Sequence, residues 1–237
     1  MIQKLADVHE FEFHETLTGF KWLANETQKL EKKGYHVLFA YEEALGYMFP
    51  SVCYDKDGLT AAMVFMAAET KWKKEGLTPY TKLQQLYSRH GFHQSLNTYV
   101  VSPDKETTST LFQSIRARGN SALSFPVGRF RDMTKGFDSG TFDGVPTLPV
   151  DSNSQMITLW TLTGVRLTIR ASGTEPKVKL YIESSASNSE DASRNVSQTF
   201  LTVLDEWVKP FAPSMTYAPK QTTSSGHSFT IPTVVAD

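Results

Sequence analysis

The sequence predicts an α/β region followed by a small α+β domain with an antiparallel sheet. Three observations lead to this fold class. Over residues 1–103 a short apolar run is followed by two helical segments, the order typical of an α/β layer. Residues 165–170 and 178–183 alternate strictly between apolar and polar side chains, which indicates antiparallel strands with one covered face. A helical segment with an apolar stripe then follows at residues 190–209, and we expect it to cover that face.

The elements of the first region follow from local signals. Residues 37–41 (VLFAY) form a short apolar run, which predicts a buried strand. A helix is expected from about residue 60 to residue 75. A second helix has Thr78 as its N-cap and a proline in its first helical position, and Gly91 ends it.

The second region has clearer patterns. We expect elements at residues 104–118 (helix), 156–161, 165–170 and 178–183 (strands) and 190–209 (helix). Residues 211–237 are rich in Ser, Thr and Pro and have no periodicity, which predicts a disordered tail. The expected domains are therefore residues 1–103, residues 104–210 and this tail.

Composition narrows the class of protein. The chain has 237 residues, 24 basic and 25 acidic side chains, a net charge of −1 and one cysteine. Clustered positive charge is the signature of nucleic-acid binding, so nucleic acid is not an expected partner. A single cysteine excludes an internal disulfide framework, and no apolar run approaches the roughly 20 residues that span a bilayer. We expect a cytoplasmic protein without a membrane partner.

The stretch RASGTEPKVK, residues 170–179, contains the most informative side chains. A loop of this kind between two strands can aim successive backbone N–H groups at one anion. Ser172 and Thr174 add hydroxyl donors, and Gly173 allows a ligand to approach the backbone. Arg170 can bind two phosphate oxygens at once, and Lys179 adds a point charge. A solvated hairpin turn carries the same residue types, so both interpretations stay open at this point.

Two acidic residues, Glu42 and Glu43, directly follow the apolar run at residues 37–41. Ligands of α/β sheets bind at the carboxyl ends of the strands. A carboxylate there can accept hydrogen bonds from two neighbouring sugar hydroxyls. The alternative is a solvated first turn of a helix.

Lys56 lies in the stretch DKDG, just before the helix expected at residue 60. Helix N-termini favour negative charge, so a lysine there is electrostatically unusual. It can attract an anionic ligand or donate a proton. The stretch is not a calcium loop, because Leu59 and Met66 stand where such a loop needs oxygen ligands. We expect no metal ligands in the chain.

Taken together, these stretches resemble the C-terminal half, domains 3 and 4, of an α-D-phosphohexomutase, most like the eukaryotic phosphoglucomutase-2 and phosphopentomutase type. RASGTEPKVKLY resembles the phosphate-binding loop of the fourth domain. FAYEEALGY resembles the sugar-binding loop of the third domain, and ETLTGFKW and DKDG match flanking segments. The resemblance runs from about residue 11 to about residue 209. It implies a partial third α/β domain followed by a TBP-like α+β domain.

The resemblance also implies residue roles. These mutases carry a phosphoserine that exchanges phosphoryl groups with a sugar phosphate, and they use Mg²⁺ and a sugar bisphosphate activator. The implied substrates are hexose or pentose phosphates. Glu42 and Glu43 would bind the sugar hydroxyls, and Thr18 and Lys56 would line the site, with Lys56 as the catalytic candidate. The residues that would hold the non-reacting phosphate are Arg170, Ser172, Gly173, Thr174 and Lys179.

The sequence departs from the family pattern in two respects. Ala44 stands where glucose-type enzymes carry serine, which favours a broader or pentose-accepting type. The family's serine loop and acidic magnesium loop have no counterpart in these residues. We therefore expect a partial chain that binds sugar phosphates without converting them and that associates through an incomplete third-domain edge. The alternatives are a non-catalytic sugar-phosphate-binding fragment and part of a hexose bisphosphate synthase.

Overall fold

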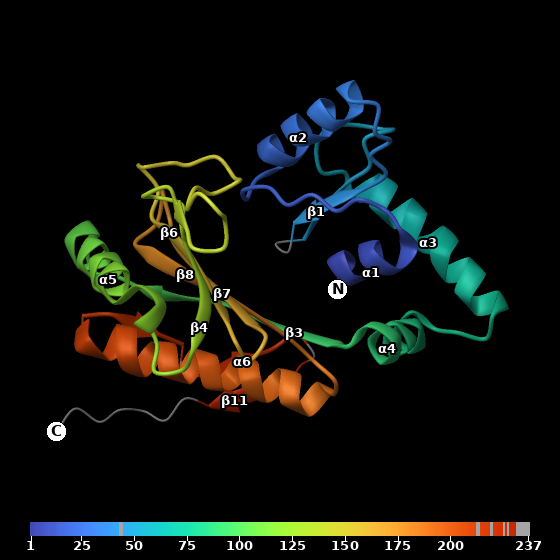
Figure 1. Ribbon diagram of the computed structural model, residues 1–237. Coiled ribbons are helices and arrows are strands. Elements are labelled where there is room, and N and C mark those ends of the chain that lie inside the picture. Colours follow the sequence, from blue (N-terminus) through green and yellow to red (C-terminus); the bar gives the residue numbers. More distant parts are fainter. Residues whose placement is uncertain (43–44, 212–213, 219, 225, 227, 231–237) are drawn as a thin grey trace. The chain divides into compact units, whose positions relative to one another are not determined.

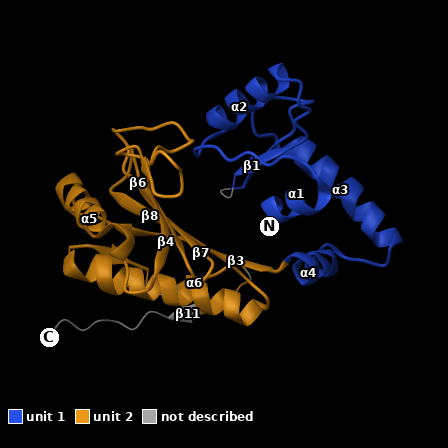
Figure 2. Cartoon of the chain, viewed as in Figure 1, with its two compact units in different colours: residues 1–90 blue, residues 91–237 orange. Residues whose placement is uncertain are grey.

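The structure is a computed structural model that describes residues 1–42, 45–211, 214–218, 220–224, 226 and 228–230. The chain forms two compact units, residues 1–90 and residues 91–237 (Figure 2). Each unit contains a sheet of its own.

Unit 1 is mostly helical. Its elements are α1 (Ile2–His9), α2 (Phe20–Lys32), β1 (Ala40–Glu42), β2 (Gly46–Met48), α3 (Gly58–Lys74) and α4 (Pro79–His90). β1 and β2 pair with each other in a two-stranded antiparallel sheet. Both predicted helices are confirmed, as α3 and α4.

Side-chain caps explain where α3 and α4 begin. The Asp57 carboxylate accepts hydrogen bonds from the backbone N–H groups of Leu59 (3.0 Å) and Thr60 (3.3 Å) at the start of α3. Thr78 caps α4 through its hydroxyl, which accepts from the Thr81 N–H at 3.1 Å. After α4 the chain turns at Gly91, whose φ of 90° lies in a region that favours glycine.

The prediction of a buried strand at residues 37–41 was wrong. β1 starts only at residue 40, and Leu38 is 71% exposed. The described residues of unit 1 contain no further strand that could pair with this run and cover it. The Phe39 ring instead stacks on Tyr41 and Tyr47, with centroids 5.7 and 6.2 Å away. Apolar content alone did not show whether neighbouring strands were available.

Unit 2 is built on a seven-stranded antiparallel sheet (Figure 1). Its strand order is β5-β4-β6-β7-β8-β3-β9. The strands are β3 (Phe92–Val101), β4 (Val127–Asp132), β5 (Phe137–Asp138), β6 (Met156–Thr161), β7 (Val165–Ala171), β8 (Lys177–Ala186) and β9 (Thr216–Tyr217). The helices are α5 (Lys105–Arg118) and α6 (Ser189–Val203), the latter continued by irregular helical turns at Leu204–Val208 and Lys209–Phe211. A separate hairpin pairs β10 (Lys220–Thr222) with β11 (Ser228–Thr230).

The predicted antiparallel sheet, with the helix near residues 190–209 over its apolar face, is confirmed, and α5 covers the same face. Leu167 on β7 and Leu180 on β8 are almost fully buried and belong to one apolar cluster. Phe112 of α5 and Phe200 of α6 fill the same cluster from the helical side. α6 lies along this face of the sheet (Figure 1). The α+β architecture therefore follows from the strand alternation and the helical stripe that the sequence contains.

The units divide between residues 90 and 91, whereas we expected a boundary near residue 103. The difference is β3, which was not predicted as a strand. β3 pairs with β8 over ten residues, from Phe92↔Ala186 to Val101↔Lys177. These long-range hydrogen bonds tie residues 92–101 to unit 2.

The chain after residue 210 was expected to be disordered, and its described part is not. β9 pairs with β3, and Met215 is 3% exposed within the core of unit 2. The side chains of Gln221 and Thr223 are buried as well. Gln221 lies in β10, which pairs with β11, and just beyond it the Ser224 N–H donates to the Ser95 carbonyl of β3 at 2.8 Å, so hydrogen bonds to a strand that was not predicted help to place this segment. None of the described helices combines the length and the apolar character that crossing a bilayer requires.

Candidate functional site

Arg170 and Lys179 lie directly opposite each other on neighbouring strands. They are register partners in the antiparallel pair of β7 and β8, so both side chains project from the same face of the sheet. This is the face opposite the one that α5 and α6 cover, because Ile169 and Leu180, next to them on these strands, belong to the apolar core. Arg170 and Lys179 therefore place two positive charges side by side, next to the turn that joins the two strands.

Ser172, Gly173 and Thr174 lie in that turn. The Ser172 N–H donates to the Lys177 carbonyl at 2.8 Å, which closes the turn. The Ser172 hydroxyl accepts from the Glu175 N–H at 3.3 Å, and a hydroxyl that accepts can still donate its own hydrogen. Gly173 and Thr174 are exposed, and a Cβ added at Gly173 would meet no atom within 4 Å. The space above the turn is open to a ligand.

Unit 1 brings Thr18, Glu42 and Lys56 into one neighbourhood. The Glu42 carboxylate accepts a hydrogen bond from the Gly19 N–H, next to the exposed Thr18. Glu42 is in β1, a strand of the hairpin, so the alternative of a solvated first turn of a helix is excluded for it. Gly46 is the partner of Glu42 across the hairpin. It lies so close to Phe20 that a Cβ added at position 46 would be 2.4 Å from the Phe20 ring.

Lys56 reaches the same neighbourhood from the segment before α3. Its ammonium group lies 5.4 Å from the centroid of the Phe20 ring and 3.3 Å from the Asp55 carboxylate. The Lys56 backbone N–H, and then its side chain, hold the pKa of Asp55 below its ordinary value. Both side chains of this pair are about two-thirds exposed, at 64% and 67%, so the contact is weak and Lys56 can exchange it for a ligand. Glu43 and Ala44 lie outside the described residues.

Two residues beside the candidate phosphate site were missed. Tyr99 on β3 is the register partner of Lys179, and the Lys177 ammonium lies 4.5 Å from the centroid of the Tyr99 ring. Lys177 also forms an ion pair of 3.0 Å with Glu175. The hydrogen bond to Glu175 raises the pKa of Lys177, and the negative charge of Glu175 acts in the same direction. Tyr99 lies in the run NTYVV, whose β-branched and aromatic residues could have indicated the strand.

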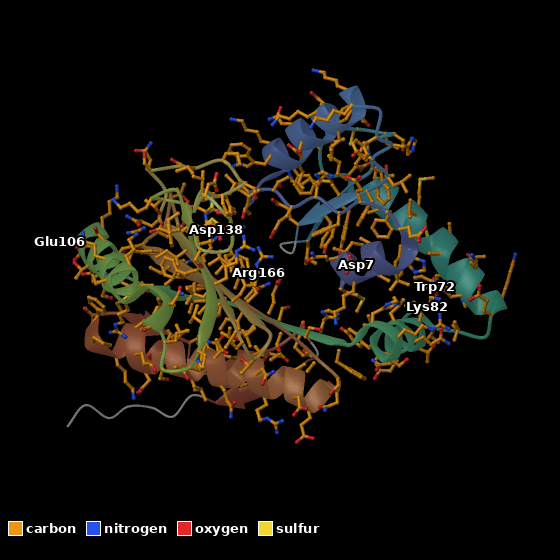
Figure 3. All side chains as sticks on the ribbon, in the orientation of Figure 1. Asp7, Trp72, Lys82, Glu106, Asp138 and Arg166 are labelled. Atoms are coloured by element: carbon orange, nitrogen blue, oxygen red, sulfur yellow. The ribbon has the colours of Figure 1, made fainter. Side chains whose placement is uncertain are left out.

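The same face of the sheet carries further arginines around one indole ring. The guanidinium carbons of Arg129, Arg131 and Arg166 lie 4.4, 4.9 and 5.5 Å from the centroid of Trp160. Asp138 neutralises part of this charge through two hydrogen bonds from Arg129, at 2.8 and 2.6 Å. Figure 3 labels Asp138 and Arg166 in unit 2. Arg166 and Arg170 are four residues apart on β7, so this charge extends toward the turn and favours an anion there.

The magnesium implied by the family resemblance does not fit the part of the chain that the structure describes. No three side chains of His, Cys, Asp or Glu come together there in a group that could hold a metal ion. The acidic residues near Lys56 act otherwise: Asp55 pairs with that lysine and Asp57 caps α3. We therefore assign these described residues no chemical step that passes through a metal.

Two family models match the chain. The model described as phosphoglucomutase/phosphomannomutase alpha/beta/alpha domain III matches residues 1–90, the whole of unit 1. The model of the C-terminal domain of the same family matches residues 154–195, which include β7, β8 and the turn between them.

Curated relatives match over most of the chain. A phosphoribomutase of Saccharomyces cerevisiae is 41% identical over 227 residues, which is 89% of this chain and 36% of the relative. A human phosphopentomutase is 33% identical over 220 residues, 89% of this chain and 36% of the relative. A mouse glucose 1,6-bisphosphate synthase is 34% identical over 218 residues, 89% of this chain and 35% of the relative. The chain thus spans about a third of the length of the relatives it matches.

A solved structure shares the fold. The open form of the Paramecium phosphoprotein parafusin, described as a phosphoglucomutase, superposes with a TM-score of 0.63 at 17% identity. The match covers 91% of this chain and 38% of that one. That likeness concerns the fold alone, whereas the two family models and the curated relatives show that the chain belongs to the phosphoglucomutase and phosphomannomutase family and carries its domain III and its C-terminal domain.

Proposed function

We propose that this chain supplies the phosphate- and sugar-holding part of a sugar-phosphate mutase, an isomerase that moves a phosphoryl group within a pentose or hexose phosphate. The names of the relatives, phosphoribomutase and phosphopentomutase, support a sugar phosphate as the ligand. One observation carries the proposal: Arg170 and Lys179 face each other on β7 and β8, beside an open turn that contains Ser172, Gly173 and Thr174.

This arrangement suits a phosphate dianion. Arg170 offers two parallel N–H donors and Lys179 a compact charge, while Ser172 and Thr174 offer hydroxyl donors. Charge-assisted hydrogen bonds are the strong class, contributing about 1.5–3 kcal/mol each. In the proposed role these residues hold the phosphate that is not transferred, and unit 2 keeps the ligand in place while its other end reacts.

Unit 1 is proposed to bind the sugar. The Glu42 carboxylate has four lone-pair positions, so it can keep its hydrogen bond from Gly19 and still accept from two sugar hydroxyls. Thr18 adds a neighbouring hydroxyl. Lys56 is the catalytic candidate: its ammonium group can neutralise developing charge on a sugar oxygen or deliver a proton to it. Glu43, outside the described residues, remains part of this proposal from the sequence alone.

Binding of sugar phosphates tests the phosphate site. We expect glucose 1-phosphate and ribose 1-phosphate to bind the purified chain in isothermal titration calorimetry. Arg170→Ala should weaken binding by about ten- to a hundredfold, the equivalent of one lost charge-assisted hydrogen bond. The matched control is Arg194→Ala, which removes an exposed arginine from α6, on the other face of the sheet. Equal affinity of Arg170→Ala and the wild-type chain would exclude the phosphate site.

Turnover tests the second part of the proposal. Phosphoryl transfer needs a group that accepts the phosphoryl and a charge that stabilises it in transit. The sequence has no counterpart of the family's serine and magnesium loops, so we expect binding without conversion. A coupled assay should contain the chain, Mg²⁺, a sugar 1-phosphate and the sugar 1,6-bisphosphate that the family is expected to use as activator. Turnover that Arg170→Ala abolishes would overturn the expectation of an inactive chain.

A bisphosphate synthase is the second candidate function, since one relative has that name. The mutase reaction and bisphosphate synthesis both require that a sugar phosphate is bound, and they differ in the phosphoryl donor. The non-catalytic binding fragment is the third. Titration with sugar monophosphates and sugar bisphosphates shows whether the chain binds either ligand. The coupled assay then shows whether a bound ligand is converted and, if it is, by which of the two reactions.

A further inference from the structure

A carboxylate lies inside the turn that we propose binds phosphate. Glu175 directly follows Thr174, and its side chain is about half exposed, at 49%. A negative charge at this position repels an anionic ligand, so the residue needs either a compensating charge or a structural purpose.

The contacts of Glu175 supply both. Its carboxylate accepts from the Lys177 ammonium at 3.0 Å, and its carbonyl accepts from the Lys177 N–H at 2.8 Å. The Lys177 carbonyl in turn accepts from the Ser172 N–H at 2.8 Å, and the Ser172 hydroxyl accepts from the Glu175 N–H. Glu175 and Lys177 therefore join the two ends of the turn through main-chain and side-chain bonds.

A third strand supports this pair. The Lys177 ammonium lies over the Tyr99 ring of β3, 4.5 Å from its centroid, and the Lys177 side chain is 28% exposed. Contact with the ring and the carboxylate together restricts the lysine more than an isolated surface ion pair would. An exposed ion pair alone restricts a lysine side chain only weakly, so the contact with the Tyr99 ring is what fixes the position of the Lys177 ammonium group.

We propose that Glu175 and Lys177, backed by Tyr99, form a charge-neutral brace that holds the shape of residues 172–176 for an anion. They are positioning residues, and neither is a ligand of the phosphate. The inference rests on the proposed function, because a brace for a binding turn presupposes that the turn binds.

The direction in which Glu175→Gln changes phosphate affinity distinguishes the brace from simple charge repulsion. If Glu175 only repelled the ligand, Glu175→Gln would tighten phosphate binding. As part of a brace, the same substitution weakens it by about three- to tenfold, the equivalent of one ordinary hydrogen bond. Lys177→Met should weaken binding by a similar factor, and Lys177→Arg, which keeps the charge and the ring contact, should restore it.

The double variant sharpens the test. Removing both charges restores the net charge of the turn, so a purely electrostatic effect would return Glu175→Gln/Lys177→Met to wild-type affinity. A brace is broken by either change, and the double variant should then bind no better than each single one. Tyr99→Phe keeps the ring and should bind normally, whereas Tyr99→Leu should weaken binding.

The experiment is isothermal titration calorimetry with inorganic phosphate and with glucose 1-phosphate, on variants whose thermal unfolding matches the wild-type chain. Lys73→Met, which breaks a comparable exposed pair with Glu69 (3.9 Å), is the control. Tighter binding by Glu175→Gln, or a double variant with wild-type affinity, would overturn the brace. If Arg170→Ala binds as the wild type does, the proposed function itself fails.

Amide hydrogen exchange tests the brace without a ligand. Breaking the ion pair should loosen the turn, so the Ser172 N–H should exchange faster in Glu175→Gln and in Lys177→Met than in the wild-type chain or in Lys177→Arg. Unchanged exchange at Ser172 in both variants would exclude the brace whether or not the turn binds phosphate.

Discussion

Gly46 and Gly173, one in each candidate site, differ in how much space surrounds them. At Gly46 an added Cβ would lie 2.4 Å from the Phe20 ring, so the hairpin of unit 1 requires a residue without a side chain. At Gly173 an added Cβ would meet nothing within 4 Å, and the backbone there does not have the positive φ that favours glycine. The protein itself therefore does not require glycine at position 173, and any requirement comes from the ligand.

Gly173→Ala tests this distinction. We expect thermal unfolding to be unchanged or slightly improved, because alanine has less conformational freedom to lose on folding. Phosphate affinity should fall, since the new methyl group occupies the space from which a ligand approaches the backbone. Gly46→Ala is the contrasting variant and should lower the stability of unit 1. Unchanged phosphate affinity in Gly173→Ala would show that the ligand does not approach this part of the turn.

At the scale of elements, a buried carboxylate ties β4 to β5. Asp138 is fully buried and accepts two hydrogen bonds from Arg129 and one from the Gly140 N–H at 2.9 Å. Burial of this carboxyl would raise its pKa, but the hydrogen bonds from Arg129 and Gly140 outweigh burial, and the pKa lies below its ordinary value. β5 has only two residues, and this pair adds a side-chain connection to β4 beside the backbone bond from the Ser139 N–H to the Phe130 carbonyl at 2.9 Å.

Asp138→Asn should destabilise unit 2 by about 2–4 kcal/mol, because a buried ion pair that loses one partner leaves a charge without compensation. The Arg129 side chain is 34% exposed, and water moderates the loss. The measurement is urea unfolding at pH 7. Asp143→Asn, an exposed change in the loop that follows β5, is the control and should have little effect.

The same pair predicts a pH dependence. A carboxylate whose pKa is lowered on folding contributes stability above the ordinary carboxyl range, near pH 4, and loses it as the pH falls through its lowered value. The stability of the wild-type chain should therefore drop more steeply than that of Asp138→Asn as the pH falls from about 5 to about 2. Parallel curves for the two proteins would contradict the assignment.

At the scale of the whole molecule, the two units differ in how they bury apolar side chains. Unit 2 contains the entire described apolar cluster, whereas α3 of unit 1 has no buried residue. Leu59, Met63 and Met66 on α3 are 80%, 69% and 56% exposed. A helix that is apolar on most sides is normally covered. We expected association through an open sheet edge, but β1 and β2 have only three residues each, and α3 is the larger exposed surface.

We therefore predict that the chain associates through α3. Light scattering after size-exclusion chromatography should give a mass that rises with protein concentration. Leu59→Lys/Met63→Lys should reduce this association, because the charges oppose burial of the helix. Leu162→Lys removes an equally exposed apolar side chain, 75% exposed, from a turn of unit 2, and it should have no such effect. A stable monomer at high concentration would exclude this role for α3.

The sequence alone determined the features that depend on near neighbours. The ends of α4 and α5 follow from Thr78, Gly91, Asp104 and Gly119, because capping involves residues within one turn of the helix. The faces of β7 and β8 follow from an alternation of period two. The RASGTEPKVK stretch indicated the candidate phosphate site for a similar reason: its residues are adjacent in the chain, and one turn between two strands keeps them together.

Tertiary structure alone decided which segments lie side by side. The exposure of residues 37–41 depends on strands that would have to pair with them, and the position of β9, in the described part of the chain after residue 210, depends on its pairing with β3. Tyr99 lies 78 positions before Lys177 in the numbering of the chain, and only the pairing of β3 with β8 places its ring against that lysine. Register between distant strands is a property of the whole sheet, because each pairing depends on which other strands are available. No local pattern encodes that choice.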